Sequence, residues 1–174
     1  MKKIMLATLL TLTLFAFSAR AQDAAPAAPA KSDNVLAGRA GYANIGVGGA
    51  YMFDPDMGMG MVSLDYYITD EIAVGPYIYA GGGGQNSFWA VAGQVKFSPE
   101  LVSVKSVRPY VSAGIGFINF DFDNNDGRYT TYLFPVGWGI EWGVSDIMSL
   151  EAGGMYEITE NTFTGINVGL RILL

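Results

Sequence analysis

The chain has 174 residues, of which 51% are hydrophobic and 13% aromatic, and its formal net charge is −6. This acidic balance argues against a nucleic-acid partner, because phosphates call for a basic face. The sequence contains neither cysteine nor histidine, which excludes disulfides, thiolate metal sites, and catalytic constellations or metal sites that depend on histidine.

The first 21 residues have the pattern of a cleaved signal peptide. Lys2 and Lys3 precede an apolar run over residues 4–17, and Ala19 and Ala21 supply the small residues that a signal peptidase requires. The run is shorter than the roughly 20 residues of a membrane-spanning helix. Cleavage after Ala21 leaves seven basic and sixteen acidic residues, a net charge of −9. The sequence therefore predicts an exported and strongly acidic mature protein.

Residues 22–34 are rich in alanine and proline, a composition typical of linkers without a core of their own. We expect a linker on the periplasmic side. The alternative is a segment that contacts the cell wall or a periplasmic partner.

Residues 35–174 are predicted to form one domain, an all-β, eight-stranded antiparallel up-and-down transmembrane β-barrel. This part of the chain has no uninterrupted apolar segment of about 18 residues, so a helical membrane span is excluded. A closed barrel is the other structure that satisfies every backbone group in a bilayer. Turn residues separate eight strand candidates, at 41–53, 59–68, 73–80, 87–97, 108–120, 131–144, 148–158 and 165–174.

The sixth candidate strand shows the strongest alternation. Its even positions are large and apolar, whereas its odd positions are mostly glycine and include Glu141. This pattern indicates an outer face toward lipid and an inner face toward a narrow polar lumen. The residues predicted to face lipid are Tyr132, Phe134, Trp138 and Trp142.

The same alternation directs the charged residues of the other strands inward. In the first and third strands the pattern does not show which residues face inward and which face outward. A lumen of this size is wide enough only for side chains, so we expect a plug of salt bridges and hydrogen bonds, in which Glu141 and Arg171 are one candidate pair. The alternatives are a proton or ion path and a catalytic carboxylate pair. The predicted lumen network comprises Asp65, Lys96, Arg108, Glu141, Glu151, Glu157 and Arg171.

Two connecting segments resemble ligand loops only in part. The glycines of residues 81–84 lack the GK[ST] sequence of a phosphate loop, so we expect a flexible external loop. Residues 121–127 are acidic, but Asp126 and Tyr132 stand where an EF-hand requires glycine and glutamate. We therefore predict no metal site and no cofactor. A weaker hypothesis is that rim aspartates hold divalent cations against lipopolysaccharide, namely Asp54, Asp56, Asp121, Asp123 and Asp126.

The last strand resembles the assembly signal of small outer-membrane β-barrels from Gram-negative bacteria, the OmpA-type transmembrane domain and its OmpX- and OmpW-like relatives. The matching residues are Asn167, Gly169, Ile172 and Leu174, and residues 108–117 also resemble a strand of these barrels. Most members of the family end in an aromatic residue, whereas this chain ends in Leu174. The resemblance implies an outer-membrane location, lipid and lipopolysaccharide as surroundings, and insertion by the barrel-assembly machinery after passage with periplasmic chaperones.

Three functions are compatible with these patterns. The first is a barrel without enzymatic activity that serves envelope integrity or surface interaction. The second is a small pore or a conduit for small hydrophobic molecules, and the third is a soluble lipocalin-like binding barrel. Because the chain stops at its last predicted strand, we expect no peptidoglycan-binding domain.

Overall fold

The structure is a computed structural model, and it describes residues 36, 38–54, 56–84, 86–100, 106–122, 127–160 and 162–174. The predicted signal peptide and linker lie outside these residues. No helix in the described ranges could span a membrane. The described residues form eight strands, as predicted: β1 (Ala43–Phe53), β2 (Asp56–Tyr67), β3 (Ile72–Gly83), β4 (Asn86–Phe97), β5 (Val107–Phe122), β6 (Gly127–Ser145), β7 (Met148–Ile158) and β8 (Thr162–Leu173).

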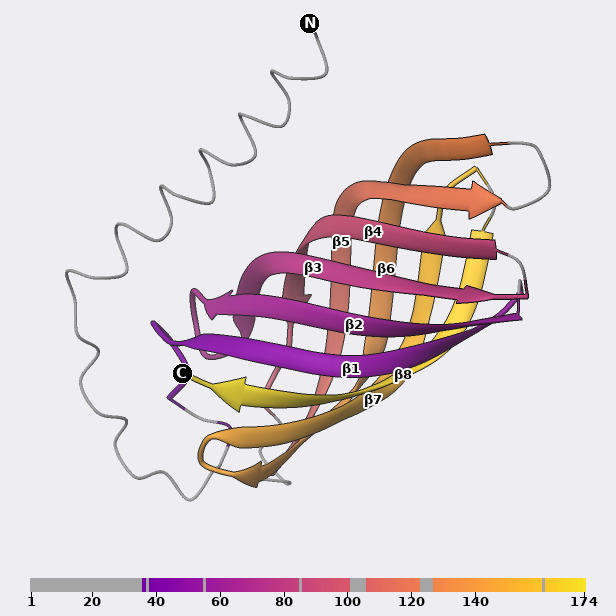
Figure 1. The fold of residues 1–174 in the computed structure, drawn as a ribbon. Coiled ribbons are helices and arrows are strands. Elements are labelled where there is room, and N and C mark those ends of the chain that lie inside the picture. The colour runs from indigo at the N-terminus through magenta and orange to yellow at the C-terminus, as the bar shows by residue number, and fades with distance from the viewer. Residues whose placement is uncertain are drawn as a thin grey trace, which may run out of the picture.

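The strands form one closed antiparallel barrel in sequence order (Figure 1). Each strand pairs with the next along the chain, and β8 closes the barrel by pairing with β1. The start of β1 and the end of β8 lie at the same end of the barrel, which we call the terminal end. The opposite end carries the β1–β2, β3–β4, β5–β6 and β7–β8 connections, and we call it the far end.

The alternation of the strands places apolar side chains on the outer surface. In β6, Trp138 and Trp142 are 46% and 58% exposed, whereas Leu133 and Glu141 are fully buried. The structure also fixes the parity that the sequence left open in β1, where Asn44 is buried and Ile45 is exposed. This apolar exterior is the reverse of what a soluble lipocalin-like barrel requires.

The strands extend further at the far end than predicted. Residues 81–83 belong to β3, so the prediction of a flexible glycine loop there is wrong. Their lack of a side chain is what permits pairing, because a Cβ on Gly81 would lie 2.2 Å from the backbone oxygen of Gly58. Asp121 and Arg128 likewise belong to paired strands and form an exposed ion pair at 2.9 Å.

The far half of the lumen is apolar, which differs from the polar lumen predicted. Side chains from all eight strands fill it, because most inward positions in this half carry thioether, aromatic, aliphatic or small residues, and Glu157 is the exception. The residues of this apolar core are Met52, Met57, Met59, Met61, Tyr79, Phe88, Ala90, Ala92, Ile118, Phe120, Leu133, Met155 and Phe163.

Candidate functional site

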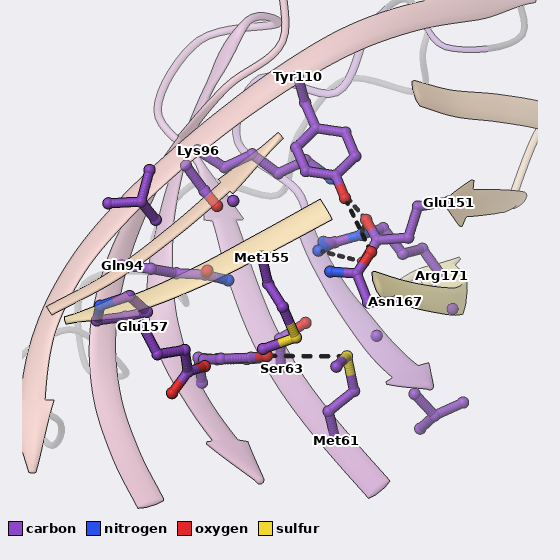
Figure 2. Close-up of a pocket in the computed structure, with 18 residues that line it drawn as sticks. Met61, Ser63, Gln94, Lys96, Tyr110, Glu151, Met155, Glu157, Asn167 and Arg171 are labelled. Atoms are coloured by element: carbon purple, nitrogen blue, oxygen red, sulfur yellow. Dashed lines mark hydrogen bonds and ion pairs between the residues drawn. The ribbon is translucent and has the colours of Figure 1, made fainter. Parts of the chain in front are cut away.

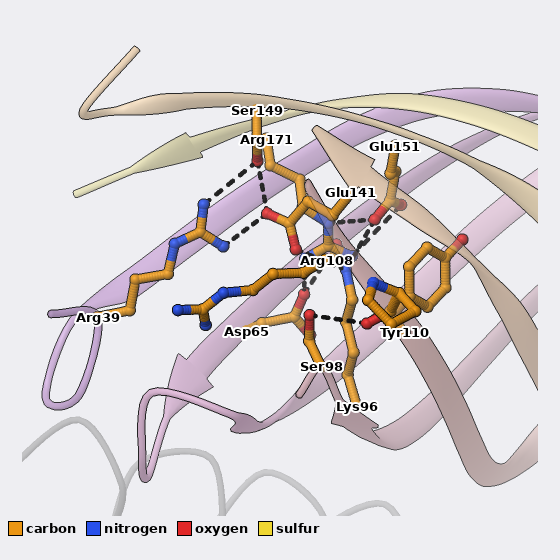
Figure 3. A network of polar contacts seen from close by, with 12 residues as sticks. Arg39, Asp65, Lys96, Ser98, Arg108, Tyr110, Glu141, Ser149, Glu151 and Arg171 are labelled. Atoms are coloured by element: carbon orange, nitrogen blue, oxygen red, sulfur yellow. Dashed lines mark hydrogen bonds and ion pairs between the residues drawn. The ribbon is translucent and has the colours of Figure 1, made fainter. Parts of the chain in front are cut away.

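The terminal half of the lumen holds a network of six charged side chains (Figure 3). Five come from strands β2, β4, β6, β7 and β8, and the sixth comes from the segment before β1. Three are cationic and three anionic, so their formal charges cancel. The members are Arg39, Asp65, Lys96, Glu141, Glu151 and Arg171.

Arg171 and Lys96 connect the carboxylates. Arg171 is ion-paired with both Asp65 and Glu151. The Nζ atom of Lys96 lies 2.9 Å from an oxygen of Glu151 and 3.4 Å from an oxygen of Glu141. Lys96 also lies over the ring of Tyr110, 4.2 Å from its centroid. Each of these cations therefore serves two carboxylates, and loss of Arg171 would leave Asp65 without an ion-pair partner among the described residues.

Glu141 binds a residue that sequence reasoning missed. Its Oε1 atom accepts hydrogen bonds of 2.6 Å from the Arg39 guanidinium and from the hydroxyl of Ser149. Arg39 also donates to the hydroxyl of Tyr67 at 2.8 Å. The candidate ion pair between Glu141 and Arg171 is not formed, because Arg171 is engaged by Asp65 and Glu151.

The segment before β1 folds into the terminal mouth of the barrel and brings Arg39 there. Leu36 is fully buried and Arg39 is 5% exposed. Gly38 and Gly41 have φ angles of 73° and 86°, in the left-handed region that favours glycine. The amide of Gly41 donates to the Tyr67 carbonyl at 2.9 Å. Arg39 belongs to no strand, so the alternation of inward and outward positions could not predict that its side chain enters the lumen. Gly38 and Gly41 were the only sequence signal, and they indicate a turn.

The charge on Arg39 is supported by its surroundings. Burial disfavours the charged guanidinium, but the Glu141 carboxylate and the Tyr67 hydroxyl outweigh that effect and raise the pKa of Arg39 above its usual value. Arg39 therefore acts as a permanent cation in the mouth.

Two residues of the predicted network lie apart from it. Arg108 donates to the backbone oxygen of Asp70 at 2.8 Å and lies 4.0 Å from Glu100 at the terminal mouth. Glu157 lies toward the apolar core, where it accepts a hydrogen bond from the Tyr79 hydroxyl. Its other oxygen, Oε1, has no partner among the described residues.

A cavity of about 40 Å³ separates the network from the apolar core (Figure 2). A water molecule needs about 10–15 Å³ by this measure, so the cavity has room for a few waters. Gln94, Tyr110 and Asn167 contribute polar groups to its wall, and Met61 and Met155 contribute thioethers. The described lumen thus contains a small, partly polar cavity between two packed regions.

The predicted lipid-facing residues all lie on the outer surface, with exposed fractions from 39% for Phe134 to 58% for Trp142. The residues of the predicted assembly signal divide between the two faces of β8. Asn167 and Gly169 line the cavity, whereas Ile172 and Leu174 are exposed outside.

We expect the substitution Glu141→Gln to lower the free energy of unfolding by about 1–3 kcal/mol. The amide keeps the size of the side chain but removes the charge that Arg39 and Lys96 share. Lys96 retains Glu151 and Arg39 retains Tyr67, which limits the loss. Urea unfolding in detergent micelles measures the effect, and unchanged stability would count against a network that supports the fold.

No protein-family model matches the chain, and no curated protein does. Solved structures do match. The N-terminal β-barrel domain of Pseudomonas aeruginosa OprF is 18% identical, with a TM-score of 0.67, over 76% of this chain and 97% of that one. Neisserial surface protein A is 18% identical, with a TM-score of 0.54, over 75% and 94%.

A de novo designed transmembrane β-barrel also matches, with 16% identity and a TM-score of 0.55 over 79% of this chain and 98% of that one. A designed barrel shares the architecture without sharing a biological role, so the likeness concerns the fold. The closed order of the strands, the apolar exterior and these matches agree: the chain has the fold of the small eight-stranded outer-membrane β-barrels.

Proposed function

We propose that this protein is an integral outer-membrane barrel whose role is envelope integrity or surface interaction. The band of exposed apolar residues around the barrel supports membrane insertion, because such a surface suits lipid and not water. The predicted periplasmic linker precedes β1, so the terminal end of the barrel faces the periplasm. Outer-membrane lipid and lipopolysaccharide surround the barrel, and the assembly machinery and periplasmic chaperones are its partners during biogenesis.

The observation that carries the structural role is the filled lumen. Arg39 and Leu36 occupy the terminal mouth, the ion pairs fill the adjacent half, and the apolar core fills the other half. Between them lies a cavity with room for a few waters. A transmembrane path for ions would require both packed regions to open, so this arrangement favours a closed barrel over a pore.

The contacts of the carboxylates also support a role without catalysis. Glu141 and Glu151 each contact Lys96 and one arginine. A general base must bind a proton readily, and ion pairs with two cations make a carboxylate a weaker base. Neither carboxylate therefore suits the catalytic pair considered from the sequence.

The first test is the location and the conductance of the full chain. Expressed in a Gram-negative host, it should appear in the outer-membrane fraction and shift its gel mobility when boiled, since a folded barrel resists detergent. Reconstituted in planar bilayers, it should give no reproducible single-channel steps, with flotation of proteoliposomes as the control for insertion. Regular conductance steps would replace the structural role with the pore. Recovery in the soluble periplasm without a mobility shift would reject the membrane barrel.

A further inference from the structure

The inward methionines of the far half form a cluster of thioethers. Met52, Met57, Met59, Met61 and Met155 are each at most 8% exposed. They come from three strands, and three of them stand at alternate positions on the inner face of β2. Methionine is a flexible filler of cores, but its thioether sulfur is also a soft metal ligand.

The register of the barrel brings these methionines together. Met52 of β1 stands directly opposite Met57 of β2. On its other side Met52 stands opposite Gly165 of β8, and Gly165 in turn stands opposite Met155 of β7. Because Gly165 has no side chain, no third side chain stands between those of Met52 and Met155 in this register.

Small residues flank Met59, whereas Met61 has a small neighbour in β1 and Tyr79 on its β3 side. The Met61 sulfur accepts a hydrogen bond of 3.9 Å from the Tyr77 hydroxyl. Met59 lies between Ala50 and Gly81, and Met61 lies opposite Gly48. A Cβ added at Gly48 would lie 3.3 Å from the Cγ of Met61. These neighbours leave the long thioether chains room to adjust, because methionine has three rotatable side-chain bonds. Rotation about these bonds is what would turn the sulfurs toward one another, with the Met61 sulfur leaving the Tyr77 hydroxyl.

A buried carboxylate lies beside the cluster. Met61, Met155 and Glu157 line the same cavity (Figure 2). Glu157 is 1% exposed, and its Oε1 atom has no partner among the described residues. The six charges of the network cancel among themselves, and no cation of the described ranges is ion-paired with Glu157. This carboxylate is thus placed to balance the charge of a bound monovalent cation.

We propose that the lumen binds a soft monovalent metal ion, Cu(I), through the thioethers of Met59, Met61 and Met155, with Glu157 compensating its charge. Neutral thioether ligands select soft ions such as Cu(I) over Ca²⁺, Mg²⁺ and Zn²⁺. The described residues contain no group of three or more acidic side chains that could hold a hard ion. Met52 and Met57 continue the row of thioethers toward the far mouth. This site does not depend on the role proposed above.

The test is an anaerobic titration of the refolded full-length barrel in detergent with Cu(I) and ascorbate, against a chromogenic Cu(I) chelator. The barrel is expected to withhold one equivalent of Cu(I) from the chelator. Added Ag(I) is expected to displace the bound Cu(I). X-ray absorption should show sulfur scatterers. The double variant Met61→Leu, Met155→Leu should lose the bound equivalent, and Glu157→Gln should weaken affinity by about tenfold or more, as loss of an outer-sphere partner does.

Met148→Leu is the matched control, because Met148 lies outside the apolar core on the outer side of β7 and should leave binding unchanged. Leucine keeps the volume of methionine, and the heat-dependent mobility shift verifies that each variant is folded. The proposal is overturned if the wild-type barrel cannot compete with the chelator, or if the double variant retains the metal. Conductance plays no part in this test, so its result is separable from that of the pore experiment.

Discussion

The substitution Arg171→Met is expected to lower the free energy of unfolding by about 3–5 kcal/mol, the cost of removing one partner from a buried ion pair. Arg171 is 4% exposed and serves both Asp65, which is fully buried, and Glu151. Its loss leaves the charge of Asp65 uncompensated and leaves Glu151 with Lys96 alone. Urea unfolding in detergent, followed by tryptophan fluorescence, measures the change.

The matched control is Arg128→Met, because Arg128 forms an ion pair with Asp121 at the far end, where their side chains are 77% and 44% exposed. Exposed pairs contribute about 0–1 kcal/mol, so this variant should be near neutral. Adding Asp65→Asn and Glu151→Gln to Arg171→Met removes the unpaired charges and should restore part of the stability. Equal effects of Arg171→Met and Arg128→Met would refute the assignment of Arg171 to a buried network.

The substitution Ile115→Arg is expected to lower the stability of the barrel in lipid by about 2–4 kcal/mol, the cost of an arginine on the lipid face at the bilayer midplane. Ile115 is 65% exposed and stands near the middle of β5, the 16-residue strand Val107–Phe122. Reversible urea unfolding in short-chain lipid bilayers measures this cost, because the effect requires a hydrocarbon environment.

The matched comparison is Ile147→Arg, which makes the same exchange of isoleucine for arginine at another position. Ile147 is 58% exposed but lies in the β6–β7 turn at the terminal end, where an arginine reaches water. The cost there should fall to about 0–1 kcal/mol. If both variants were equally stable in lipid, the outer surface of β5 would not be a membrane surface, and a soluble barrel would return as the leading interpretation.

The division of the lumen into two halves connects these predictions. Charges concentrate in the terminal half, where five strands contribute one member each to the network, whereas thioethers and aromatic rings fill the far half. We therefore expect substitutions in the network to act through electrostatic imbalance, and substitutions in the apolar core to act through lost packing.

The number of strands and the face of each charged residue follow from the sequence by itself. A strand has a period of two, so alternation in β6 separates Trp138 from Glu141 whatever the rest of the chain does. The lipid environment makes this signal strong, because a wrong register would bury each charge in hydrocarbon. For the same reason, Asp65, Lys96 and Arg171 could be placed inside without any knowledge of their neighbours.

Tertiary structure decided which of these residues meet. Alternation predicts whether a side chain faces inward or outward. It does not predict how far along the barrel axis the side chain lies or how far it is from side chains of other strands, because the stagger between strands sets both. Glu141 therefore pairs with Arg39, which belongs to no strand, while Arg171 pairs with Asp65 and Glu151. Closure of the barrel likewise placed Met155 two strands from Met52 across Gly165. Contacts between distant strands depend on the whole register of a closed sheet, and no local pattern encodes them.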